Sequence, residues 1–221
     1  MTTLRYRFQT REFGEYDIHY RALRNRQQYD DRSGEAEALG ISAASWPLFG
    51  VVWQAGEVLA KLMADYDIDN RRILEVGCGV GLASLLLNKR HADVSATDIH
   101  PSAKANLDYN TRLNNDRDIP FLRTAWEDNP DACFGQFDLI ICSDVLFEPD
   151  HAGKLAHFIE LYAKPVCEVV LVDAGRGLSN EFTRSMEANN YHRERVEDID
   201  PFTDPERFRG RIQRYQRGFP H

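Results

Sequence analysis

Three glycines and two acidic residues within one short stretch carry the clearest chemistry in this sequence. Gly77, Gly79 and Gly81 alternate with other residues, Glu75 precedes the first of them, and Asp98 ends an apolar run further on. A glycine adopts a positive φ readily and allows a ligand to come close to the backbone. A carboxylate can accept hydrogen bonds from two ribose hydroxyls at once. These residue types in this order therefore predict a nucleotide-binding site.

The elements around this stretch must place the glycines and Asp98 side by side. Residues 73–76 form a short apolar run, apolar residues at helical spacing follow the glycines, and residues 94–97 form a second run. This order predicts one β-α-β unit with Asp98 at the end of its second strand. A dinucleotide fingerprint would need Gly or Ala in place of Leu82, so the spacing argues against a pyrophosphate. The alternatives are a dinucleotide after all, or a tight turn that binds no ligand.

The stretch from Glu75 to Gly81 has the form E-x-G-x-G-x-G, which resembles the first motif of the seven-stranded (class I) S-adenosylmethionine-dependent methyltransferases. In that family the second strand ends in a ribose-binding acid, which corresponds to Asp98. The resemblance implies S-adenosyl-L-methionine as the cofactor. Its implied binding residues in this part of the chain are Glu75, Gly77, Cys78, Gly79, Gly81, Asp98 and Ile99, the last of them against the adenine.

Two tryptophans extend the predicted cofactor site. Trp53 ends an aromatic-rich turn before an apolar helix, and Trp126 directly follows a predicted strand at residues 119–122. Both are similar to tryptophans of the methyltransferase-like protein-lysine methyltransferase group that lie at the cofactor, although the acid that precedes the second one in that group is Ala125 here. An aromatic ring suits adenine because its face is flat and weakly polar. The alternative for both residues is packing in the core.

The predicted strand at residues 137–142 leads into Ser143, Asp144 and Phe147, where we expect the chemistry. Parallel sheets bind ligands at the carboxyl ends of their strands, so Ser143 should contact the cofactor and Asp144 should lie above it. The lysine methyltransferase group carries Asp-x-x-Tyr here, and this sequence keeps the ring but replaces tyrosine with Phe147. The resemblance implies that Asp144 orients the incoming amine and that Phe147 packs against the methyl donor. A helix N-cap is the alternative role for Asp144.

A turn after the next predicted strand is expected at the same edge of the sheet. Asp173 and Arg176 in this turn could line the substrate side, and the turn resembles one in relatives of the electron-transfer-flavoprotein lysine methyltransferase. A solvated arginine in an ordinary turn is the alternative.

The whole pattern predicts an α/β fold: a Rossmann-like, seven-stranded, mostly parallel sheet with helices on both faces and an antiparallel last strand pair. We expect this methyltransferase domain to span residues 46–221, with its last two strands at residues 191–196 and 208–215 joined through Pro201 and Pro205. Residues 1–45 are predicted to be an extension. It contains a β-hairpin at residues 4–23, either added to the sheet or lying over it, and a polar segment at residues 25–40 that is either a solvated loop or a lid.

The amino-acid composition limits the kinds of partner and cellular location that we expect. The net charge of −8 disfavours nucleic acid as a partner, because phosphate binding requires clustered Lys and Arg. No run reaches the roughly 18 apolar residues of a membrane span, and the first residues do not resemble a signal peptide. The four cysteines form no C-x-x-C pair, and no zinc-type Cys/His set occurs. We therefore expect a cytoplasmic protein without a metal and without a nucleic-acid or membrane partner, while its oligomeric state is left open.

These features together predict a methyltransferase that acts on an amine, with the lysine side chain of a protein substrate as the first candidate. A small-molecule or protein-arginine N-methyltransferase on the same fold is the closest alternative. A cofactor-binding module without catalysis is a further one, acting through the arginines of its last strands, such as Arg211, Arg214 and Arg217.

Overall fold

A seven-stranded sheet forms the centre of the computed structural model, which describes residues 4–199 and 208–219. Its order is β5-β4-β3-β6-β7-β9-β8, and β3 pairs in parallel with both β4 and β6. The chain therefore reverses its direction of travel across the sheet between β3 and β6, which is where open α/β sheets bind ligands. The antiparallel partners of β9 are β7 and β8, which confirms the predicted last strand pair. The strands are β3 (Arg72–Val76), β4 (Asp93–Asp98), β5 (Phe121–Arg123), β6 (Phe137–Ser143), β7 (Ala163–Asp173), β8 (His192–Asp198) and β9 (Arg211–Arg217).

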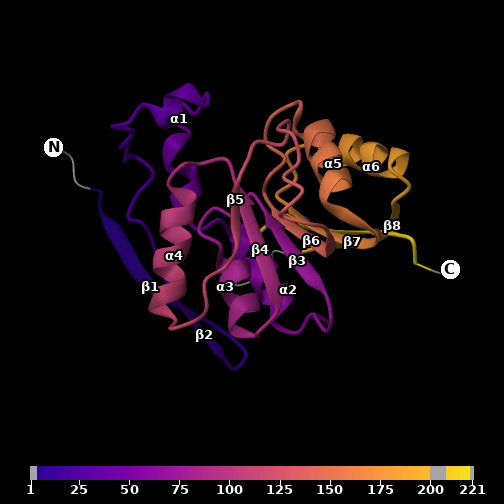
Figure 1. Ribbon diagram of the computed structural model, residues 1–221, viewed down its shortest axis with the longest axis horizontal. Coiled ribbons are helices and arrows are strands. Elements are labelled where there is room, and N and C mark those ends of the chain that lie inside the picture. Colours follow the sequence, from indigo (N-terminus) through magenta and orange to yellow (C-terminus); the bar gives the residue numbers. More distant parts are fainter. Residues whose placement is uncertain (1–3, 200–207, 220–221) are drawn as a thin grey trace.

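Helices cover both faces of this sheet (Figure 1). Neighbouring residues of β3 show why, because Ile73 and Leu74 point to opposite faces and belong to two different buried clusters. A strand that is buried on both sides is mostly apolar, which explains the nearly continuous apolar runs of the sequence. One face carries α2 (Gln54–Ala64), α3 (Leu82–Lys89) and α4 (Ala103–Leu113), and the other carries α5 (His151–Tyr162) and α6 (Ser179–Ala188).

The N-terminal hairpin forms a separate two-stranded sheet of β1 (Tyr6–Phe13) and β2 (Tyr16–Leu23). It lies beside α4 at the left of Figure 1, where hydrogen bonds join its backbone to side chains of the domain. The His19 and Arg21 amides donate to the Asn114 and Asn110 Oδ1 atoms, each at 2.8 Å. Of the two predicted arrangements, the hairpin therefore lies over the domain and is not added to the main sheet. The domain boundary at residue 46 stays a prediction.

The segment between the hairpin and α2 contains two short helices, α1 (Glu35–Ala38) and the 3₁₀ helix η1 (Trp46–Gly50). The Asp31 carboxylate accepts hydrogen bonds from the amides of Ala36 and Glu37, and Glu35 forms an ion pair with Arg123 at the end of β5. These contacts tie to the end of the sheet the segment that was predicted as either a solvated loop or a lid, and the choice between these two roles stays a prediction.

The last strand begins later than predicted, since β9 starts at Arg211 and not at Phe208. The prolines predicted to join the last two strands, Pro201 and Pro205, lie outside the described residues. The arginines of β9 are engaged by neighbours: Arg211 pairs with Asp198, Arg214 with Glu197 and Arg217 with Glu160. Among the described residues, no helix combines the length and the apolar character needed to cross a membrane.

Candidate functional site

The glycine loop between β3 and α3 lies at the carboxyl end of β3, as predicted. Gly77 and Gly81 have φ values of 63° and 77°, in the left-handed region that favours glycine. A Cβ on Gly77 would lie 2.8 Å from Val145 Cγ1, and one on Gly81 would lie 2.6 Å from Leu107 Cδ1. The loop is therefore packed closely against the segment after β6 and against α4, and any side chain at these positions would displace it.

Asp98 lies at the end of β4, directly beside the glycine loop. Its Oδ2 accepts the Gly79 amide and its Oδ1 accepts the His100 amide, both at 2.9 Å. These bonds fix the carboxylate and leave each oxygen a further lone pair, so the residues present fit a ribose diol. Burial raises the pKa of Asp98 above its ordinary value. The adjacent Ile99 keeps 37% of its surface exposed, so an apolar side chain is available beside the carboxylate.

Glu75 lies beneath the glycine loop and is buried. Its Oε2 accepts the Ser84 amide at 2.8 Å and also the Ser84 hydroxyl. These contacts support a role for Glu75 in holding the first turn of α3 against the end of β3, and its implied contact with the cofactor stays a prediction. Removal from water raises the pKa of Glu75 to about 7.

Asp144 lies just beyond β6, next to Ser143, and its carboxylate is held by an arginine from a different loop. Arg176 donates to it through two hydrogen bonds, Nε to Oδ1 at 2.9 Å and Nη2 to Oδ2 at 2.8 Å. The Asp144 backbone has a φ of 52°, a left-handed value that is uncommon outside glycine and is found at functional sites. The helix N-cap alternative is not supported, because α5 begins only at His151, with Asp150 as its N-cap.

The turn after β7 differs from its prediction in one residue. Arg176 reaches Asp144 as described, but Asp173 is 1% exposed and accepts the Ser179 hydroxyl at 2.5 Å. Asp173 therefore does not line a substrate surface, because its carboxylate points into the start of α6.

Three aromatic side chains meet beside Asp144. His151 makes edge contacts with Trp126 and with Phe147, with ring centroids 5.0 and 4.5 Å apart. The His151 Nδ1 donates to the Val145 carbonyl at 2.9 Å, which fixes the ring between the other two. Phe147 is half exposed, and its packing against the methyl donor stays a prediction. The sequence analysis did not include His151 in the site, and the one signal that could have found it was its four-residue spacing from Phe147.

Trp53 lies in a segment that touches the site at both ends. The Phe49 carbonyl oxygen is 3.1 Å from the position of a Cβ on Gly79, and a Cβ on Gly56 would lie 3.6 Å from Ser143 Oγ. The indole of Trp53 donates to the Leu48 carbonyl at 3.0 Å. The segment is therefore packed between the glycine loop and the end of β6, and a cofactor contact for Trp53 stays a prediction.

One group of three side chains in the described part of the chain could offer ligand atoms to a metal. Glu148, Asp150 and His151 bring such atoms within 4.8 Å of one another. The Lys154 ammonium already contacts Asp150 at 2.5 Å, so a cation is present in this group. The predicted reaction needs no metal, and the group adds no step to it.

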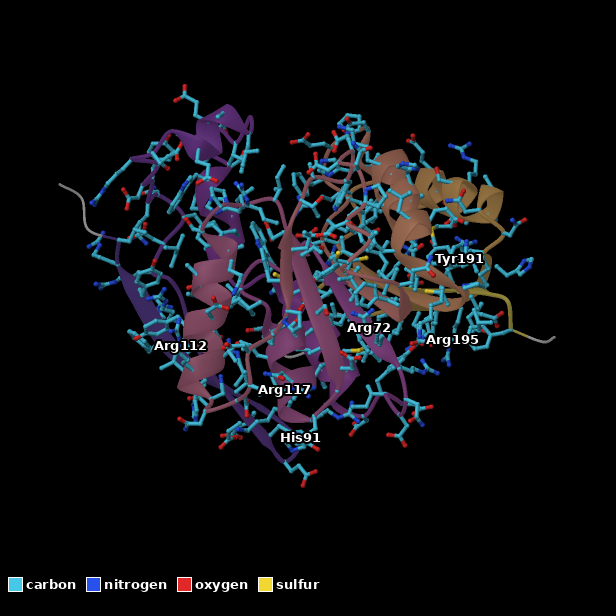
Figure 2. The ribbon with its side chains drawn as sticks, viewed as in Figure 1. Arg72, His91, Arg112, Arg117, Tyr191 and Arg195 are labelled. Atoms are coloured by element: carbon cyan, nitrogen blue, oxygen red, sulfur yellow. The ribbon has the colours of Figure 1, made fainter. Side chains whose placement is uncertain are left out.

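A cavity of about 430 Å³ lies at the opposite edge of the sheet, where β3 and β4 begin. Arg72 and His91 mark this edge in Figure 2, away from the loops that follow the strands. The wall of the cavity carries acidic side chains, such as Asp93 and Asp138, and basic side chains, such as Arg72. Ligands of α/β sheets bind at the carboxyl ends of the strands, so this cavity is not the site described above.

The strand order, the glycine loop and the acid that follows β4 together define a class I S-adenosylmethionine-dependent methyltransferase, and its cofactor is S-adenosyl-L-methionine. The model of one such family, described as lysine methyltransferase, matches residues 45–189. The chain belongs to this lysine methyltransferase family.

Individual curated relatives match this chain at low sequence identity. The chain is 28% identical over 134 residues to protein N-lysine methyltransferase METTL21A of Danio rerio, covering 58% of this chain and 58% of the relative. It is 25% identical over 119 residues to the electron transfer flavoprotein beta subunit lysine methyltransferase of Mus musculus, covering 52% of this chain and 46% of the relative. The chain thus spans about half the length of these curated relatives.

Solved structures share the fold. The ribosomal protein L11 methylase of Lactobacillus delbrueckii subsp. bulgaricus aligns with a TM-score of 0.62 at 18% identity, over 76% of this chain and 81% of that chain. The magnesium protoporphyrin IX methyltransferase of Synechocystis PCC 6803, solved with bound SAM, aligns with a TM-score of 0.58 at 20% identity, over 74% of this chain and 78% of that chain.

Proposed function

We propose that this protein transfers a methyl group from S-adenosylmethionine to the side chain of a lysine in another protein. The observation that carries the proposal is the carboxylate of Asp144, which Arg176 holds at the end of β6 in a chain of the lysine methyltransferase family. The names of the two lysine methyltransferase relatives support the same acceptor.

The residues of the glycine loop and β4 hold the cofactor in this proposal. Gly77 and Gly79 admit its amino-acid end, Asp98 accepts the ribose hydroxyls, and Ile99 and Trp126 flank the adenine. When bound, the cofactor supplies an electrophilic methyl carbon, so the protein needs no covalent intermediate. Its task is to align the amine nitrogen with that carbon, and alignment alone can supply much of the rate enhancement.

Asp144 and Arg176 act on the incoming amine. A lysine attacks only as the neutral amine, whereas a lone carboxylate nearby stabilises the ammonium form and raises the lysine pKa. The guanidinium of Arg176 offsets the charge of Asp144, because the two groups are joined by two hydrogen bonds. The oxygens of Asp144 keep lone pairs that can accept an N–H of the amine and thereby direct its own lone pair toward the methyl group.

The aromatic group of Trp126, Phe147 and His151 forms the wall beside this carboxylate in the proposal. Phe147 has no hydroxyl, so it acts by packing against the methyl donor and by excluding water. His151 holds Phe147 and Trp126 at a fixed separation through the two edge contacts.

Protein arginine is the second candidate acceptor, because the chain is 33% identical over 104 residues to histone-arginine methyltransferase METTL23 of Xenopus laevis. That match covers 44% of each chain. The two acceptors differ in the product, which an amino-acid hydrolysate distinguishes.

The test is transfer of radiolabelled methyl from S-adenosylmethionine into an extract of source cells that lack this gene, with Asp98→Ala as the control enzyme. We expect one or a few labelled protein bands whose hydrolysate contains methyl-lysine, and much weaker labelling of the same bands with the control. Methyl-arginine in the hydrolysate would replace lysine with arginine as the acceptor. Label confined to the small-molecule fraction would contradict a protein substrate.

A further inference from the structure

We propose that a groove between the N-terminal hairpin and the start of α2 binds an acidic segment of the protein substrate, near the lysine to be methylated. This inference rests on the proposed function, because it assigns the surface that recognises the same substrate. The groove has a volume of about 340 Å³ and is formed by one face of the hairpin, residues 24–26 and the beginning of α2.

The wall of the groove is strongly basic. Arg7, Arg11, Arg24 and Arg26 line it, and Glu57 is the one acid that does. Glu57 forms an ion pair with Arg11 at 2.8 Å, so the other three positive charges face the groove without an acid on its wall. Within residues 4–199 and 208–219, no ion pair involves any of these three arginines, and all three side chains are exposed. This cluster stands in a chain whose net charge is −8.

The hairpin is built so that these arginines share one face. Side chains alternate along a strand, so Arg7 and Arg11 of β1 point to the same side as Gln9 between them. Tyr20 and Ala22 of β2 are paired with Gln9 and Arg7 and complete this face. The β2 half of this face packs into the core, where Tyr20 and Ala22 are buried, whereas Arg7 on β1 is exposed. The hairpin therefore packs on the domain through β2 and presents the basic side chains of β1 at the rim of the groove.

The groove adjoins the proposed methyl-transfer site through the start of α2. Arg26 lies over the ring of Trp53, with its guanidinium carbon 4.3 Å from the ring centroid. Gln54 lines the groove, and Gly56, on the same first turn of α2, faces Ser143 at the end of β6. Gln54 and Gly56 point to different sides of the helix, so a segment in the groove would be separated from Ser143 by about the width of one helix, roughly 10 Å.

Arginine suits this task because its guanidinium binds carboxylates through two parallel hydrogen bonds. The volume accommodates a few side chains and not a folded domain, so the occupant is an extended peptide with Asp or Glu close to its target lysine. An acidic enzyme attracts basic segments of many proteins without selecting among them. The basic groove would favour a segment in which Asp or Glu lies close to the target lysine. The groove thus selects the substrate segment, while Asp144 acts on the amine of the lysine itself.

The test compares two labelled peptides on the full chain with saturating S-adenosylhomocysteine, read by fluorescence anisotropy. The probe is a fluorescein-labelled peptide with one lysine flanked by glutamates, and its partner has glutamine in place of every glutamate. The variant is Arg7→Gln with Arg24→Gln, which leaves Arg26 and its contact with Trp53 intact. The matched control is Arg184→Gln with Arg195→Gln, which removes equal charge from α6 and β8, where Figure 2 labels Arg195 at the far side from α4.

We expect the acidic peptide to bind more tightly than its glutamine partner. The groove variant should weaken it by about five- to tenfold, the effect of losing two partly exposed charge contacts, and the control variant by less than twofold. All variants should bind S-adenosylhomocysteine equally, which shows that they are folded. Equal binding of the two peptides, or equal effects of the two variants, would overturn the inference. A single-stranded RNA that binds more tightly than the acidic peptide, and loses affinity in the groove variant alone, would overturn it in favour of nucleic acid.

The experiments distinguish a failure of the proposed function from a failure of the groove inference. If the wild-type protein labels no protein in the cell extract while the two peptides still differ, the methyl acceptor is wrong but the acidic ligand stands. If the extract shows labelled protein and the groove variant labels the same bands at the same rate as the control, the acceptor stands and the groove inference is wrong.

Discussion

Replacing Glu75 with glutamine is expected to change how the free energy of unfolding depends on pH. Glu75 is buried against Ser84, and removal from water raises its pKa from 4.5 to about 7. Between these two values the folded protein keeps a proton that the unfolded chain releases. The stability from this proton is fully present below about pH 4.5 and is lost as the pH rises through 7, because the ionised carboxylate must then be buried.

The size of the effect follows from the shift. A difference of one pKa unit corresponds to about 1.4 kcal/mol, so the full shift is worth on the order of 3 kcal/mol. Over the range from pH 5.5 to pH 8, linkage predicts a loss of about 2 kcal/mol from this group. Glutamine carries no charge at any pH and keeps an oxygen for the Ser84 donors, so the Glu75→Gln protein should not show this loss.

Urea unfolding at a series of pH values measures the difference between wild type and Glu75→Gln, in which the titration of other groups largely cancels. The variant should gain about 2 kcal/mol relative to wild type between pH 5.5 and pH 8. Glu181→Gln, a change at an exposed position of α6, is the control and should give a constant difference. A constant difference for Glu75→Gln as well would show that Glu75 is ionised in the folded protein at all these pH values, and would refute the reasoning.

Three further changes test the rest of the site. Asp98→Ala should weaken S-adenosylhomocysteine binding by about 1–3 kcal/mol in calorimetry, because it removes a charged hydrogen-bond acceptor; an unchanged affinity would remove Asp98 from the cofactor site. Arg176→Gln should lower turnover at least about tenfold and leave that affinity unchanged, because it releases Asp144 from its two hydrogen bonds; equal losses in turnover and affinity would contradict this division of roles. Gly81→Ala should destabilise the fold by about 1–3 kcal/mol in urea unfolding, because its Cβ would meet Leu107 and its φ is 77°; an unchanged stability would show that the loop adapts freely.

Much of the sheet could be predicted because its signals are local. Each inner strand is a short apolar run, and the glycines after residue 76 mark a strand-to-helix turn whatever surrounds them. The boundaries of the strands could be predicted less well, because a strand begins and ends where its partner does. The late start of β9 opposite β7 is an example. The position of the hairpin was left open because its partners, Asn110 of α4 and the C-cap residue Asn114, bind it only once the domain has folded.

The candidate site divides in the same way. Glu75, Gly77 and Asp98 belong to one β-α-β unit, so their spacing in the sequence already brings them together. Asp144 was assigned to the same edge from the end of its strand, but its binding to Arg176 was not foreseen. The acid expected beside that arginine, Asp173, is buried instead.

The sequence by itself determined the nucleotide unit, the order of helices and strands, and the cofactor class, because these depend on backbone requirements within a few neighbouring residues. Only the tertiary structure decided the partner of Asp144, the position of His151 between Trp126 and Phe147, and the basic groove beside α2. Each of these joins segments that are far apart in the chain. Such contacts follow from the order of strands in the sheet and from the packing of the hairpin on the helices, and no local pattern encodes them.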